Sequence, residues 1–180
     1  MNTALLYSSV DQMLEPAELA RLLGRGVETV RIEPVDGLRG STDADFLAVS
    51  LDQEAAPSLM MKHVHPTTDW VALFTDDRQR RAVKLWSEGV LDRMPAAVDP
   101  SVVACAEWTD GYGILMPHLG SEMLESHVPQ PAWMDGAILA AMAAMHAAFW
   151  EDSRLDDPAL GLCSIDSQVR NISPRRTRQV

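Results

Sequence analysis

The sequence predicts an α+β fold in which a five-stranded antiparallel sheet carries one helix inserted after the third strand and is followed by a long helix. Three observations predict it. Short apolar runs separated by turn-forming residues recur through the first 119 residues. Between the third and fourth runs the apolar spacing becomes helical. Residues 131–150 are rich in alanine and carry apolar residues at helical spacing. We expect two parts, 1–119 and 120–180.

The first elements are a helix and three strands. Residues 14–23 place Pro16 where a first helical turn tolerates proline, and Gly24 ends the leucine-rich pattern. Next, Val30 and Ile32 alternate with polar residues, which is typical of a strand. The runs FLAVSL and SLMMKHV follow, after the turn-rich stretches DGLRGSTDAD and DQEAAP. They predict the second and third antiparallel strands.

The inserted helix is expected to begin at Thr75 or Asp76, either of which can cap it, and to end at Pro95. Its apolar stripe consists of Val83, Leu85, Trp86, Val90 and Leu91. The runs SVVACAEW and GYGILMPHL then predict two strands joined by a turn at Thr109-Asp110-Gly111. In the final helix four residues share one face, which we expect to be directed toward the core: Ile138, Met142, Met145 and Phe149.

Composition excludes several classes of protein. With 15 basic and 26 acidic side chains the formal charge is -11, which repels nucleic acid and anionic membrane surfaces. No stretch is long and apolar enough to span a membrane, and the first residues do not resemble a signal peptide. We therefore expect a soluble, cytoplasmic chain. Cys105 and Cys163 lie in apolar settings without a CxxC partner and are expected to be buried thiols.

Lys62 is the first candidate for a functional residue. It is a charged side chain inside the apolar run SLMMKHV, and an unpaired buried ammonium is costly. One interpretation is an edge-strand lysine whose stem is buried while its ammonium reaches water, and spacing alone favours this one. The other is a phosphate-binding lysine on the third strand of a nucleotide-binding lobe.

The loop GLRGST is the second candidate. Gly37 and Gly40 allow close approach of the backbone, and Ser41 and Thr42 add hydroxyl donors, a combination that can cradle phosphate oxygens. A plain hairpin loop would look much the same, because neither GxGxxG nor the Walker pattern is present.

Two histidines are the third candidate. His63 and His65 are two apart on a strand, so they share one face and can supply two metal ligands. No third ligand is recognisable nearby in the sequence, and we assign no metal site. No Ser-His-Asp or Cys-His arrangement is recognisable, so no catalytic residue is assigned.

Taken in order, the segments resemble the amino-terminal lobe of a protein-kinase-like small-molecule kinase of the aminoglycoside phosphotransferase family. The similar stretches, between about residues 14 and 165, are PAELARLLGRGVETVRIEPVDGLRGST, SLMMKHV, RRAVKLWSEGVLDRMP, GYGILMPHL and AAMAAMHAAFWED. The resemblance implies ATP as the cofactor, with Lys62 on the α- and β-phosphates. It further implies that the loop over the phosphates contains Gly37, Gly40, Ser41 and Thr42. The adenine pocket would be lined by the hinge residues Met116, Pro117, His118 and Leu119.

The sequence departs from the family's pattern in two places. The inserted helix has Ala82 where the glutamate that pairs with Lys62 is expected, and Glu88 is the nearest candidate for that role. No HGD-like or HRD-like motif occurs, so the aspartates that hold Mg²⁺ and accept the acceptor's proton in this family are not present. The resemblance therefore implies a truncated gene product or fragment of such a kinase, in preference to a specialised pseudokinase. In this fragment the first helix of an incomplete, mainly helical carboxy-lobe follows the nucleotide-binding lobe. We expect weak nucleotide binding without turnover.

Phosphorylation of a small-molecule hydroxyl acceptor is the activity of the parent family. A different class stays open: a non-enzymatic, acidic α+β module that binds a partner protein, with Lys62 merely structural. An incomplete carboxy-lobe also predicts an exposed apolar face on the last helix, and hence self-association.

Overall fold

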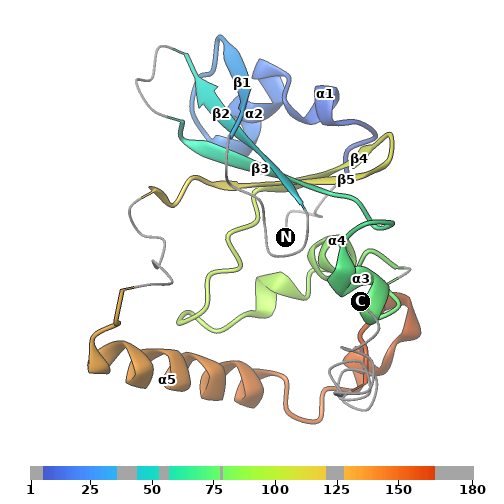
Figure 1. The fold of residues 1–180 in the computed structure, drawn as a ribbon, viewed down its shortest axis with the longest axis vertical. Coiled ribbons are helices and arrows are strands. Elements are labelled where there is room, and N and C mark those ends of the chain that lie inside the picture. Colours follow the sequence, from blue (N-terminus) through green and yellow to red (C-terminus); the bar gives the residue numbers. More distant parts are fainter. Residues whose placement is uncertain (1–5, 36–43, 53–56, 78, 121–127, 165–180) are drawn as a thin grey trace.

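A five-stranded antiparallel sheet is the centre of the fold (Figure 1). The structure is a computed structural model that describes residues 6–35, 44–52, 57–77, 79–120 and 128–164. Its strands are β1 (Val30–Pro34), β2 (Asp45–Leu51), β3 (Leu59–Val64), β4 (Ala104–Trp108) and β5 (Gly111–Pro117). Their order in the sheet is β1-β2-β3-β5-β4, and every neighbouring pair is antiparallel. The five predicted strands are thus confirmed, and β3 is central rather than at an edge.

Two helices precede the sheet, α1 (Val10–Met13) and α2 (Pro16–Leu23). The side chain of Ser9 caps α1 by accepting a hydrogen bond from the amide of Gln12. Gly24 ends α2 with a φ of 66°, a left-handed conformation that glycine adopts without strain, as the sequence predicts. The short helix α1 was not predicted, because four residues are too few for a periodic pattern.

Strand alternation divides the core between the two faces of the sheet. On one face α1 and α2 pack against β3 and β5, where Met61 lies opposite Leu115 and both are fully buried. On the other face Ile114 and Val64 form a smaller cluster with Val83. That valine belongs to α4 (Arg81–Ser87). The first cluster anchors the amino-terminal helices, and the second anchors α4.

The segment between β3 and β4 differs from the single helix predicted there. It contains α3 (Trp70–Phe74), α4 and the short 3-10 helix η1 (Leu91–Arg93). The predicted caps are wrong: Asp69 caps α3, and Thr75 is the residue that ends it. Left-handed residues at Asp76 and Arg80 separate α3 from α4, and Gly89, with a φ of 68°, follows the end of α4. An apolar stripe can therefore continue across backbone breaks that divide a helix.

The long helix α5 (Ala132–Ala148) forms where the sequence predicts it, but its predicted core-facing packing is wrong. It runs on the side of the molecule remote from the sheet (Figure 1), and none of its residues is buried. Ile138 is 46% exposed and Met142 is 47% exposed. The helix forms because alanine has a high helix propensity, but helix propensity does not determine which face of a helix is buried. The apolar residues in the middle of α5 are therefore exposed.

The chain after α5 forms two short 3-10 helices, η3 (Ser153–Asp156) and η4 (Pro158–Leu160). Arg81 of α4 donates from Nε to the carbonyl of Gly161 at 2.7 Å, which ties this segment to α4. Of the two cysteines, Cys105 is buried as expected, whereas Cys163 is half-buried. Within the described ranges, no helix is long and apolar enough to cross a membrane.

Candidate functional site

Lys62 lies near the middle of the central strand β3. In the register it faces Phe46 of β2 on one side and Ile114 of β5 on the other. Since cross-strand partners share a face, Lys62 projects on the side of Ile114, which packs against Val83 of α4. The lysine and α4 are therefore on the same face of the sheet.

The Lys62 side chain is half-buried, and within the described residues it has no ion pair. Its same-face neighbours along the sheet are apolar, among them Met60 and Met116, which lie opposite each other in the β3–β5 register. An ammonium in such surroundings retains a strong attraction for an anion, because few neighbours compete for its protons. The face thus offers one cation beside an apolar surface.

Glu88, the candidate partner of Lys62, is placed elsewhere. It is the residue that caps the carboxyl end of α4, and its Oε1 lies 3.7 Å from Nζ of Lys84, four residues earlier. No ion pair joins it to Lys62 in the part of the chain that the structure describes. The i,i+4 spacing of Lys84 and Glu88 explains this local pairing.

The expected hinge follows directly from β5. Met116 and Pro117 are the last two residues of that strand, and His118 donates its amide to the carbonyl of Ser58 at 3.0 Å. Leu119 is 43% exposed. The structure brings Met116 to the face of Lys62, while the predicted phosphate loop, with Gly37, Gly40, Ser41 and Thr42, lies outside the described residues.

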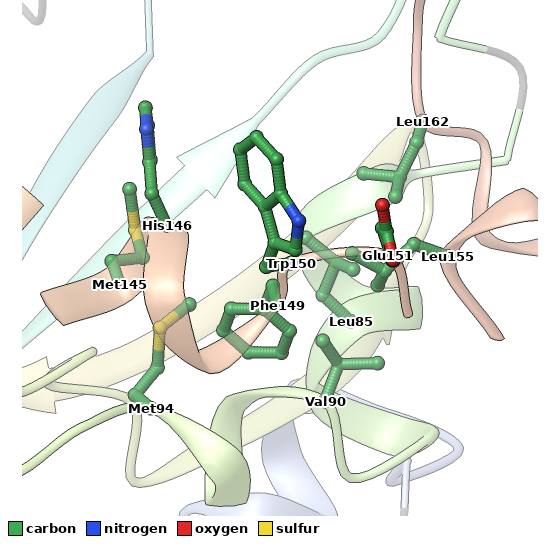
Figure 2. A pocket seen from close by; sticks show the side chains of 10 residues that line it. All are labelled: Leu85, Val90, Met94, Met145, His146, Phe149, Trp150, Glu151, Leu155 and Leu162. Atoms are coloured by element: carbon green, nitrogen blue, oxygen red, sulfur yellow. The ribbon is translucent and has the colours of Figure 1, made fainter. Parts of the chain in front are cut away.

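An apolar pocket of about 370 Å³ lies beneath α4, at the carboxyl end of α5 (Figure 2). Figure 2 shows the Phe149 ring between Met94 on one side and Leu85 and Val90 on the other. Its full lining is Leu85, Val90, Met94, Met145, His146, Phe149, Trp150, Glu151, Leu155 and Leu162. A pocket of this size suits a small apolar ligand. His146 and Glu151 are the ionisable side chains of its lining, and they form no recognisable arrangement for acid–base or nucleophilic chemistry.

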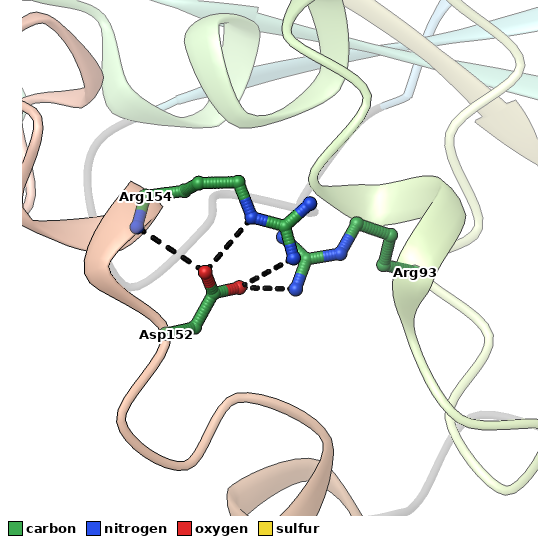
Figure 3. Close-up of polar contacts among 3 residues, drawn as sticks. All are labelled: Arg93, Asp152 and Arg154. Carbon is green, nitrogen blue, oxygen red and sulfur yellow. Dashed lines mark hydrogen bonds and ion pairs between the residues drawn. The ribbon is translucent and has the colours of Figure 1, made fainter.

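A charged cluster holds the wall of this pocket together (Figure 3). Asp152 pairs with Arg93 of η1 and, through Oδ1, with Nε of Arg154 at 2.8 Å. Hydrogen bonds from Arg154 and then Arg93 hold the pKa of the Asp152 carboxyl well below its usual range. The Arg93 guanidinium also lies 4.9 Å from the centre of the Phe149 ring. These contacts join η1 to the end of α5 and explain the position of the pocket.

The opposite face of the sheet carries a cluster of two histidines and two aspartates. Nε2 of His65 lies 3.1 Å from Oδ2 of Asp45, and Nδ1 of His65 lies 3.2 Å from Oδ2 of Asp110. Nε2 of His63 lies 3.0 Å from Oδ1 of the same Asp110. One potential ligand atom from each of Asp45, His63 and His65 lies within 4.8 Å of the others.

The His63 ring is held between its neighbours. It is 8% exposed and stacks on the indole of Trp108, with ring centres 3.8 Å apart and an interplanar angle of 13°. Burial, followed by the nearby His65, lowers the pKa of His63, although Asp110 opposes that shift. Gly113 lies opposite His63 in the register and leaves room for the indole on this face.

Sequence reasoning found His63 and His65 and placed them on one face, but it missed both aspartates. Asp45 begins β2 and faces His63 only because the two strands are aligned in that register. Asp110 was assigned to a turn, which is where it lies. The available signals were an aspartate before one apolar run and the sequence HVH at the end of the next run. The register that brings these segments together is not visible in either one alone.

Comparisons of the chain with protein-family models, with curated proteins and with solved structures find no match. The functional argument therefore depends on the arrangement of the residues themselves.

Proposed function

We propose that this chain binds a nucleoside triphosphate at Lys62 in the manner of the aminoglycoside-phosphotransferase-like kinases, as a protein-kinase-like amino-terminal lobe. One observation carries the proposal: a half-buried lysine without an ion pair among the described residues projects from the central strand on the face that α4 covers. Protein kinases use a lysine on their third strand to contact the α- and β-phosphates. In the parent family the phosphoryl group then passes to a small-molecule hydroxyl.

The chemistry of the face supports the same ligand. A triphosphate supplies the anionic partner that Lys62 does not have among the described residues, and the contact is stronger beside apolar residues than in water. Met116 is half-buried on this face, opposite the buried Met60, and its thioether offers an apolar, adaptable contact for a purine ring. The hinge residues Met116 to Leu119 leave the sheet at that end of β5.

The proposal covers nucleotide binding and not turnover. The sequence contains no HGD or HRD motif, and Glu88 pairs with Lys84 instead of fixing Lys62. Since phosphoryl transfer depends on positioned carboxylates and metal ions, we expect binding without a measurable rate of transfer.

The test is thermal unfolding of the chain over a series of Mg-ATP concentrations, with calorimetry for the dissociation constant. At ten times the dissociation constant the ligand stabilises the folded state by about 1.4 kcal/mol. For a chain of this size that raises the Tm by roughly 3–6 °C. Lys62→Met is expected to abolish the shift, whereas Lys84→Met, the same change at the chain's other lysine, is expected to preserve it. An unchanged Tm in wild-type protein at 10 mM Mg-ATP would overturn the proposal.

The second candidate function is protein binding through α5. Its exposed apolar residues favour this function, since Leu139 is 65% exposed and Trp133 is 69% exposed. Apolar surface of this kind on one helix is typical of an interaction face. Light scattering after size-exclusion chromatography tests self-association directly. Leu139→Glu is expected to lower the measured mass, with Asp135→Ser on the same exposed helix as the control. A monomer in the wild type at every concentration would exclude self-association.

A further inference from the structure

We propose that Asp45, His63 and His65 bind a divalent transition-metal ion, with zinc as the reference metal and Asp110 as the carboxylate that positions both imidazoles. The site lies on the face of the sheet opposite Lys62, because adjacent residues of β3 point to opposite sides. It is therefore independent of nucleotide binding.

The backbone brings the three ligands together. His63 lies in β3, His65 is the first residue after that strand, and Asp45 of β2 lies directly opposite His63. In a tetrahedral zinc site neighbouring ligand atoms are about 3.3 Å apart. Ligand atoms within 4.8 Å of one another thus need to close by about 1.5 Å at most, which side-chain torsions accommodate without moving the sheet.

Asp110 supplies the outer contact that metal-binding histidines usually have. Its Oδ1 accepts a hydrogen bond from Nε2 of His63 at 3.0 Å, and its Oδ2 lies 3.2 Å from Nδ1 of His65, within ion-pair distance. Nε2 of His65 donates to Oδ2 of Asp45 at 3.1 Å, and a metal ion bound between these two atoms would replace that proton, with the ring's proton then held on Nδ1 beside Asp110. Because Nε2 of His63 donates to Asp110, its lone pair is on Nδ1, and His63 would bind the metal through that atom. Such outer carboxylates fix the tautomer and raise the basicity of the ring.

The surroundings restrict the rings and attract a cation. Stacking on Trp108 limits the motion of His63, and two carboxylates beside two imidazoles make the cluster anionic. Asp45 is exposed and His65 is half-buried, so the site is accessible to an ion from solvent.

The donor set indicates the kind of metal. Two imidazole nitrogens and one carboxylate oxygen suit Zn²⁺ and neighbouring first-row ions, whereas Ca²⁺ and Mg²⁺ favour all-oxygen sites. Three protein ligands leave one position open for water or another small ligand. The alternative is a purely structural histidine–aspartate network that holds the β4–β5 turn against β3.

The experiment uses the full chain freed of metal by chelation. Zn²⁺ titration by calorimetry is expected to show one equivalent of tight binding, and Co²⁺ is expected to give the intense visible absorption of a tetrahedral site. His65→Asn and Asp45→Asn are each expected to weaken binding at least 100-fold. Asp110→Asn is expected to weaken it by about 10- to 100-fold. The control is His146→Asn, which changes an exposed histidine on α5 and should leave binding unchanged.

A second measurement separates binding from folding. Zn²⁺ is expected to raise the Tm of the wild type but not that of Asp45→Asn. Because the side chain of Asp45 is exposed, the Asp45→Asn variant is expected to fold without metal. A wild type that binds less than one equivalent, or whose affinity is unchanged by His65→Asn, would overturn the proposal in favour of the structural network.

Discussion

Gly113→Ala tests the packing that positions His63. A methyl group at this position would lie 3.2 Å from Cγ2 of Val10 and 3.4 Å from both Sδ of Met61 and Cε3 of Trp108. Carbon atoms pack best at about 3.5–4.0 Å, so the valine contact is too close and both others are tight. Met61 is fully buried and has no free space to retreat into. Overpacking of this kind costs about 1–3 kcal/mol of folding free energy.

The assay is urea unfolding followed by far-UV circular dichroism. The same substitution at Gly136 is the control, because a methyl group there meets nothing within 4 Å and the residue lies inside α5. Alanine there is expected to stabilise the chain by up to about 1 kcal/mol through helix propensity. The two substitutions should therefore change the free energy of unfolding in opposite directions, with Gly113→Ala lowering it and Gly136→Ala raising it. If Gly113→Ala leaves the free energy of unfolding unchanged, the packing described between Trp108 and β5 is wrong.

The same variant links packing to metal binding. A displaced Trp108 no longer stacks on His63, so Gly113→Ala is expected to weaken Zn²⁺ binding by about tenfold, the lower end for changes outside the ligand set. Gly136→Ala should leave the Zn²⁺ affinity unchanged, since α5 lies remote from the sheet (Figure 1), whose strands β2 and β3 carry Asp45 and His63.

Two further predictions concern the cysteines and the response to acid. Burial raises the pKa of the Cys105 thiol to about 12. At pH 8 a thiol reagent is therefore expected to modify only Cys163 in the folded protein and both cysteines after unfolding. Rapid modification of both cysteines in the folded protein would contradict the buried position of Cys105. The pKa of Asp152 is lower in the folded chain than its ordinary value of 3.8. Its ion pairs with Arg93 and Arg154 therefore stabilise the fold fully above that pH, and the stabilisation is lost as the pH falls below it. In acid titrations followed by circular dichroism, the free energy of unfolding of Asp152→Asn should fall less steeply between pH 5 and pH 2 than that of the wild type. An equally steep fall in both proteins would contradict the ion pairs of Asp152 (Figure 3).

The strands could be predicted because their signals are local. Alternation around Ile32, the apolar runs and the turn at Asp110 each specify a strand or its end within a few residues, and the structure confirms all five. The segment after β3 could not be predicted in the same way. Its apolar stripe favours one helix, but positive φ angles at Asp76, Arg80 and Gly89 divide it. Arg80 gives no sign of this in the sequence, because an arginine rarely adopts such a conformation.

For the candidate sites, too, the sequence predicts individual residues from local patterns but does not predict their partners. Lys62 and the two histidines stand out within one apolar run, because charged and polar side chains are unusual there. Their partners depend on contacts between segments that are distant in the sequence. Glu88 was the nearest acid to the expected position for pairing with Lys62, but it pairs with Lys84 one turn away. Asp45 was not considered as a ligand, although the sheet places it opposite His63.

Strand β3 contributes residues to both proposed binding sites, and it places the two sites on opposite faces of the sheet. Along β3 the side chains alternate, so Lys62 projects toward α4 while His63 projects toward the side of α1 and α2. A backbone that aligns Asp45 with His63 also aligns Phe46 with Lys62, since both pairs belong to one register. Loss of that register would remove both sites together, because a shift of one residue exchanges the two faces. Loss of a single side chain removes only one: Lys62→Met should leave Zn²⁺ binding intact, and Asp45→Asn should leave the Tm shift by Mg-ATP intact. A variant at either residue that abolished both activities would show that it had damaged the sheet and not a site.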